Sequence, residues 1–240
     1  MENSIVLETR IPKKYKSKLI GEGTSGSCYL TTFGNVYKEL NQVGRYLYDQ
    51  IKDLTNYKSD LIAFPKSLIY YKYESKRGFR GYLMDHFEGV TLDYLEGKID
   101  INVFLDHLYK LEEEIKNISK EGIVLSDIND KNMMYDENGG LKLIDTDLYE
   151  TQLYKDFDKC YEWNMIELFN AIMDFIFFTK FVYFDNEKLD DLYRYCGYNG
   201  KLKPSEFLHE FVEFVNKNRN TNIKTLSNLR NKGYRYFKFR

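Results

Sequence analysis

The stretch "EGIVLSDINDKNMMYDENGGLKLIDTD", from Glu121 to Asp147, joins a loop rich in carboxylate and amide side chains to a short hairpin. Asp127 precedes Asn132 by five residues in the loop, and Asp145 follows on the far strand of the hairpin. Carboxylate and amide oxygens are ligands that Mg²⁺ prefers, and an unpaired carboxylate can orient a hydroxyl nucleophile and take its proton. We therefore expect these three side chains to converge on one site suited to phosphoryl transfer.

The regions on either side of this stretch predict an α-rich second part of the chain. The preceding sequence "INVFLDHLYKLEEEIKNISKEG" keeps apolar residues at helical spacing and stops at Gly122. The hairpin itself is expected from "KNMMYD" and "LKLID", with turn residues in "ENGG". Everything after Trp163 again looks mainly helical, with Trp163 interpreted as a core anchor.

The first third of the chain predicts a small antiparallel sheet. Its sequences "SKLIGEG", "SCYLTTF" and "NVYKEL" place β-branched and aromatic residues between glycine breakers. A helix is expected from Gln42 to about Asn56, and two further strands in "KSLIYYKYES" and "RGFRGYLMDHFEG". The fold class is therefore α+β with two lobes: a β-rich lobe over residues 1–88, a connection at about 85–89 and an α-helical lobe over residues 89–240.

Composition limits the classes of function. The 240 residues are 43% hydrophobic and carry a formal net charge of −2, so the chain can bury a core but has no global field to recruit nucleic acid. Three cysteines without metal-ligand spacing, and no apolar segment of signal-peptide length at the start, predict a cytoplasmic protein. The apolar run from Phe169 to Phe184 contains Asp174 and Lys180 and is expected to be a buried helix, not a membrane span.

A glycine-rich loop and a lysine on the next strand suggest a phosphate-binding element. Gly21, Gly23 and Gly26 lie between two predicted strands, where missing side chains would let backbone N–H groups approach phosphates, although an ordinary hairpin turn is the alternative. Lys38 could reach the α- and β-phosphates of a nucleotide. We expect a carboxylate from the following helix to hold it extended, either Asp53 or Asp49, unless these form a solvated face.

With these motifs in order, the chain resembles the protein-kinase-like superfamily from about Leu19 to Asp147. The resemblance implies ATP and Mg²⁺ as cofactors, Asp127 as the catalytic aspartate, and Asn132 and Asp145 as magnesium ligands. It also implies further nucleotide-binding positions, at which Met84 would be the gatekeeper, the backbone of Asp85 and Phe87 would pair with adenine, and Cys28 would pack above the adenine ring.

The sequence also departs from the protein-kinase pattern. Leu125 and Ser126 stand where the family usually has His and Arg, so control by a phosphorylated activation loop is not expected. Asn129 and Thr146-Asp147 look more like small-molecule kinases such as the aminoglycoside phosphotransferase and choline kinase branches. Asp147 is expected either to support the metal site or to be a solvated turn residue.

These observations predict an ATP- and Mg²⁺-dependent kinase that phosphorylates a hydroxyl group. A protein serine or threonine is the first choice of acceptor and a small hydroxylated molecule the second, while a nucleotide-binding pseudokinase scaffold is the alternative of another class. The basic and aromatic ending "NKGYRYFKFR" is interpreted as an edge strand or a solvated terminus, with an acidic partner as the alternative.

Overall fold

The computed structural model describes residues 4–8, 11–96, 99–151, 153–154, 156–177 and 203–237. The end of the apolar run predicted as a buried helix, with Lys180 and Phe184, and one of the three cysteines, Cys196, lie outside them. The chain divides into two compact units. The first comprises Met1–Glu88 and Leu143–Thr151, and the second Gly89–Lys142 and Gln152–Arg240. The segment Leu143–Thr151, which carries Asp145 and Asp147, therefore belongs to the β-rich unit.

The first unit is built on a six-stranded sheet with strand order β1-β5-β6-β4-β3-β2. Its strands are β1 (Ser4–Leu7), β2 (Lys18–Glu22), β3 (Gly26–Leu30), β4 (Val36–Leu40), β5 (Ser67–Tyr71) and β6 (Phe79–Met84). The five predicted strands, β2 to β6, pair antiparallel as expected. β1, which the sequence did not predict, runs parallel to β5 and makes the sheet mixed. Backbone hydrogen bonds to an edge strand fix its direction, and a residue pattern does not reveal them.

Strand register divides the sheet into two faces. Tyr37 is paired with Leu83 across β4 and β6, and both pack with Ile69 and Tyr15 in a buried cluster on one face. The alternation of side chains along a strand then directs the next residue, Lys38, to the opposite face.

Helix α1 (Arg45–Leu54) confirms the helix expected between Gln42 and Asn56. Ile51 and Leu54 on it are fully buried. The ring of Tyr48 meets the ring of Phe79 edge to face at a centroid distance of 5.2 Å, which packs the helix against β6.

Hydrogen bonds to main-chain atoms of Ala63 attach the segment Leu143–Thr151 to the rest of the first unit. The Leu143 carbonyl accepts a hydrogen bond from the Ala63 N–H at 2.9 Å, and the hydroxyl of buried Thr146 donates to the Ala63 carbonyl at 3.0 Å. A short 3₁₀ helix, η2 (Thr146–Leu148), and β11 (Glu150–Thr151) follow. These bonds join two parts of the chain that are about eighty residues apart in sequence.

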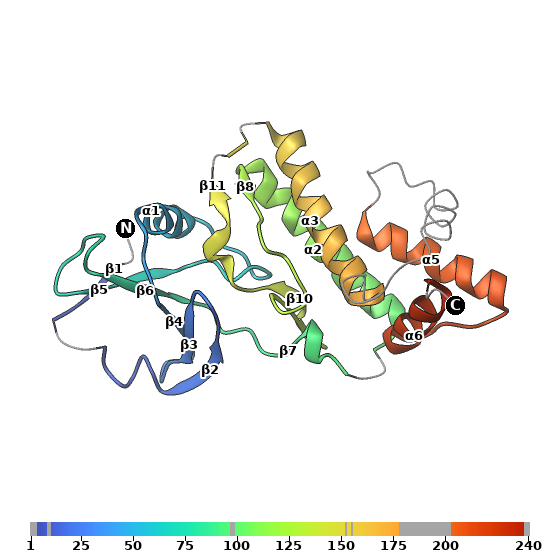
Figure 1. Ribbon diagram of the computed structural model, residues 1–240, viewed down its shortest axis with the longest axis horizontal. Coiled ribbons are helices and arrows are strands. Elements are labelled where there is room, and N and C mark those ends of the chain that lie inside the picture. The colour runs from blue at the N-terminus through green and yellow to red at the C-terminus, as the bar shows by residue number, and fades with distance from the viewer. Residues whose placement is uncertain are drawn as a thin grey trace. The chain divides into compact units, whose positions relative to one another are not determined.

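The second unit is mainly helical. Its elements are β7 (Val90–Thr91), η1 (Leu92–Tyr94), α2 (Ile101–Lys120), β8 (Ile123–Val124), β9 (Met133–Asp136), β10 (Gly140–Leu143), α3 (Phe157–Phe177), α5 (Pro204–Arg219) and α6 (Leu226–Phe237). α3 packs against α2, α5 and α6 (Figure 1). The predicted hairpin is confirmed as β9 and β10, which form a three-stranded sheet with β7.

Local signals account for the ends of these elements. α2 ends at Lys120, and Gly122 follows with φ of 73°, which a glycine adopts without strain. In the hairpin turn, the Asp136 carboxylate accepts hydrogen bonds from the N–H groups of Asn138 and Gly139. The predicted turn residues therefore act through local backbone geometry.

One expectation for the helical part, and one of the two alternatives for its ending, were wrong. Trp163 is not a core anchor, because it is 44% exposed, while the neighbouring Asn164 is fully buried. Of the two alternatives for the basic ending, the edge strand is wrong over residues 231–237, because α6 continues to Phe237. Among the helices that the structure describes, none combines the length and apolar character needed to cross a membrane.

Candidate functional site

Lys38 lies in the middle of the sheet in the first unit. It is on β4, opposite Cys28 on β3 and opposite Tyr82 on β6, so these side chains share one face. Lys38 is only 2% exposed. A β-carbon at Gly81 would overlap the Lys38 carbonyl oxygen, so glycine at that position permits β6 to approach β4 at this point.

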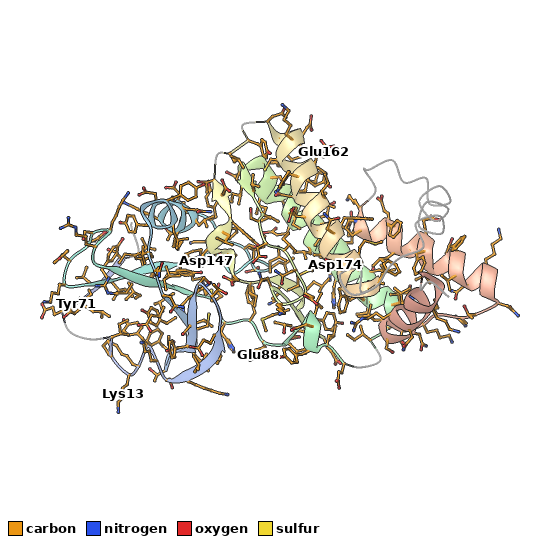
Figure 2. All side chains as sticks on the ribbon, in the orientation of Figure 1. Lys13, Tyr71, Glu88, Asp147, Glu162 and Asp174 are labelled. Atoms are coloured by element: carbon orange, nitrogen blue, oxygen red, sulfur yellow. The ribbon has the colours of Figure 1, made fainter. Side chains whose placement is uncertain are left out.

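The buried Lys38 ammonium is held by two carboxylates. It donates hydrogen bonds to Asp145 Oδ1 and to Asp147 Oδ1, the second at 2.8 Å. The Asp147 side chain is 2% exposed and the Asp145 side chain 36% exposed. Asp147, on the segment after β10 (Figure 2), is therefore a buried ion-pair partner and not a solvated turn residue.

The three charges shift one another's pKa values. Burial lowers the pKa of Lys38, but the charges of Asp147 and Asp145 outweigh burial and raise it above its ordinary value. Burial and the adjacent Asp145 carboxyl raise the pKa of Asp147 to about 6, against the opposing effect of Lys38. Burial would also raise the pKa of Asp145, yet the hydrogen bond with Asp147 and the charge of Lys38 lower it. Asp145 is thus the more readily ionised carboxyl.

The Lys38 partners differ from those expected on α1. The exposed carboxylate of Asp49 forms an ion pair with Lys76, and Asp53 accepts a hydrogen bond from the Thr151 hydroxyl at 3.4 Å. Both aspartates lie on the exposed side of α1, whereas the helix buries Gln50. Helical spacing gave both as candidates because it does not show which side of a helix will be covered.

The predicted glycine loop forms a tight, mostly exposed turn between β2 and β3. The Gly23 N–H donates to the Gly26 carbonyl at 2.9 Å. A β-carbon at Gly26 would overlap the Glu39 carbonyl, whereas one at Gly23 would meet nothing within 4 Å. Gly26 is therefore explained by close strand packing, while Gly21 and Gly23 remain candidates for phosphate binding.

The other predicted nucleotide-binding positions also lie in the first unit. Cys28 is half-buried, and burial raises the pKa of its thiol to about 11, which favours packing over thiol reactivity. Met84 is 6% exposed at the end of β6, opposite Val36. Phe87 is buried in the following loop, where the Asp85 side chain forms an ion pair with Lys66.

Asp127 and Asn132 come together in the second unit. The Asn132 side-chain amide donates to the Asp127 carbonyl at 2.9 Å and to Asp127 Oδ2 at 3.0 Å. Asn129 likewise donates to Asp127 Oδ1 at 2.9 Å, so both carboxylate oxygens accept an amide hydrogen bond. The exposed Asp127 carboxylate is thereby fixed in orientation.

Asp127 and Asp145 share an unusual backbone conformation. Their φ angles are 60° and 61°, in the left-handed region that residues other than glycine rarely adopt. Such strain is maintained only where surrounding contacts enforce it, and it is common at functional sites. Lys72 and Asn220 also have positive φ, at 68° and 46°, so this conformation by itself does not mark a functional residue.

A buried polar residue that the sequence did not reveal supports the Asp127 loop. Asn164 on α3 accepts a hydrogen bond from the Leu125 N–H at 2.7 Å and donates to the Ile123 carbonyl at 2.8 Å. It also donates to the Ser119 hydroxyl at 2.9 Å. The sequence signal that could have revealed Asn164 is its position four residues after Cys160 and four before Leu168, which places this polar residue on the apolar side of the helix.

Asp145 and Asp147 in the first unit carry carboxylate oxygens, the ligand type that a divalent cation prefers. Asp147 Oδ2 is buried and receives no hydrogen bond from the described residues, beside the partly exposed carboxylate of Asp145. A carboxylate oxygen in this state is satisfied by a proton or by a hard cation. Among the described residues, no group of three or more His, Cys, Asp or Glu side chains forms a metal site by itself.

The structure thus brings together two groups of candidate residues, Lys38 with Asp145 and Asp147 in one unit, and Asp127 with Asn132 in the other. Comparison of the sequence with protein-family models gave no match. A search of curated proteins gave no significant match either. The chemistry of these two groups must therefore carry any functional conclusion.

Proposed function

We propose that this protein is an ATP- and Mg²⁺-dependent phosphotransferase with a protein-kinase-like fold, acting on a hydroxyl group. The observation that carries the proposal is the buried Lys38, held by carboxylates 107 and 109 residues further along the chain. A buried ammonium is costly unless it is paired, so a chain that gathers two carboxylates around one supports a site for a charged ligand.

The proposal gives each group a role. Lys38 binds nucleotide phosphates, and Asp145 and Asn132 provide oxygen ligands for magnesium. When bound, ATP would supply the transferable phosphoryl group, and magnesium would partly neutralise its negative charge. Asp127, oriented by Asn129 and Asn132, positions the acceptor hydroxyl and receives its proton.

The acceptor is proposed to be a protein serine or threonine, with a small hydroxylated molecule as the second candidate. The observation favouring the second is Asn129, whose amide bonds the Asp127 carboxylate where serine/threonine kinases typically have a lysine. Incubation with labelled ATP and fractionated cell extract distinguishes the two. Label in protein supports the first acceptor, and label confined to low-molecular-weight material supports the second.

The catalytic claim is tested by ATP consumption in the presence of an acceptor fraction. Asp127→Ala should lower the rate by about 10²–10⁴-fold, the usual contribution of a positioned acid or base. Asp130→Ala, in the same loop, is the matched control and should retain the parent rate. Equal rates for the parent and Asp127→Ala would exclude this mechanism, and ATP binding without turnover would favour a pseudokinase scaffold.

A further inference from the structure

We propose that Asp147 is the positioning residue that holds Lys38 in the nucleotide site, in place of a carboxylate from α1. This inference rests on the proposed function and specifies how its lysine is oriented. Its starting point is the 2.8 Å ion pair between Lys38 and Asp147, whose side chains are 3% and 2% exposed.

Helix α1 presents an amide, not a carboxylate, on its buried side. Gln50 is 7% exposed, and its side-chain N–H donates to the Tyr149 carbonyl. The neighbouring Asp49 is engaged with Lys76 on the exposed side. A neutral amide bonded to the backbone provides no charge for Lys38, so the required negative charge comes from the segment after β10.

Helix α1 is bound to the segment after β10 by contacts that do not involve Lys38. Besides the Gln50 bond, the Tyr46 hydroxyl donates to Glu150 at 2.9 Å, and the Thr151 hydroxyl donates to Asp53. The lysine and the helix are therefore both fixed by the segment from Asp145 to Thr151, through different residues. Displacement of α1 would not by itself remove the partner of Lys38.

The two carboxylates on Lys38 have different access to solvent. Asp145 is 36% exposed on its side chain, so it can engage a ligand, whereas Asp147 is enclosed. Thr146 between them is buried and tied to the Ala63 carbonyl, which fixes their relative positions. Asp147 therefore keeps Lys38 paired when Asp145 binds a metal ion.

The test is the dissociation constant of ATP with saturating Mg²⁺, measured by calorimetry, and the binding of Mg²⁺ alone is measured for each variant as the control for metal coordination. Asp147→Asn keeps the shape of the side chain and should weaken binding about tenfold, the effect of losing one hydrogen bond to a charged group. Asp49→Asn and Asp53→Asn are matched controls and should stay within about twofold of the parent. Gln50→Ala should likewise bind ATP like the parent.

A double-mutant cycle separates positioning of Lys38 from a general loss of structure. In a Lys38→Met background, where both charges of the pair can be removed together, Asp147→Asn should cause no further loss of ATP affinity. A further loss there, or parent-like binding by Asp147→Asn alone, would overturn the inference. A parent chain that binds no ATP would instead overturn the proposed function, and this inference with it.

Discussion

Individual residues of the sheet are constrained by how closely its strands approach. A β-carbon at Gly81 would overlap the Lys38 carbonyl, so Gly81→Ala must displace the backbone of β4 or β6. We expect a loss of about 1–3 kcal/mol in the free energy of unfolding, measured by urea denaturation. Gly23→Ala is the control, because open space surrounds that position, and its stability should match the parent's. Equal stability of the two variants would contradict this account.

Asn164 is a second residue whose role depends on burial. Asn164→Ala would leave the Leu125 N–H and the Ile123 carbonyl without their side-chain partner in a buried region. We expect a cost of about 2–4 kcal/mol in unfolding free energy, since each unsatisfied group costs about 1–3 kcal/mol. Asn170→Ala, at an exposed position of α3, should be neutral or slightly stabilising. A similar change in unfolding free energy for both variants would contradict this role of Asn164.

Residue type and spacing predicted the candidate site residues better than they predicted which residues contact one another. Lys38, Asp127, Asn132 and Asp145 were selected by residue type and spacing, and the structure gives each a specific, constrained environment. Their assigned roles stay predictions. The Asp147 partner of Lys38 was not recognised, because a contact between residues 109 positions apart leaves no periodic signal.

At the level of elements, α5 obtains its N-terminal cap from another helix. Its own N-cap residue, Lys203, makes no capping hydrogen bond with its side chain. Instead, Glu112 on α2 accepts hydrogen bonds from the Ser205 N–H at 2.7 Å and from the Ser205 hydroxyl at 2.6 Å. A carboxylate at this end of α5 also complements the helix dipole.

The buried Glu112 cap predicts that the stability of the fold depends on pH. Burial raises the pKa of Glu112 above its ordinary value, although the bonds from Ser205 partly oppose the shift. The folded state therefore binds the proton more tightly than the unfolded state, so this contribution to stability is complete below the unfolded pKa and is lost as pH rises through the folded pKa. In urea denaturation between about pH 4 and pH 7, the free energy of unfolding of the parent should include a loss from Glu112 as pH rises, and Glu112→Gln should lack it. A parent and variant with the same pH profile would contradict the assignment.

The elements themselves were largely predictable. Glycine breakers and apolar periodicity located the strands β2 to β6, the helices α1 and α2, and the β9–β10 hairpin. The parallel strand β1 was missed, because its four residues pair with β5 more than sixty positions away. The exposed Trp163 was misplaced because residue type alone does not determine which side of α3 is covered.

At the scale of the whole molecule, the chain passes between its two units three times, after Glu88, after Lys142 and after Thr151. The first unit is therefore not continuous in sequence. A fragment of residues 1–88 would lack both carboxylates that pair Lys38 and the Leu143 backbone that bonds Ala63. An unpaired ammonium at this buried position would be strongly unfavourable.

We therefore expect the fragment of residues 1–88 to be poorly folded when expressed alone, with broad, poorly dispersed amide signals by NMR. The same fragment carrying Lys38→Met should be more ordered, because it removes the uncompensated charge but keeps the apolar stem of the side chain. Lys18→Met, at an exposed position on β2, is the matched control and should give no improvement. A well-folded fragment without the substitution would show that the sheet does not need Leu143–Thr151, and that the carboxylates on this segment serve ligand binding and not the stability of the unit.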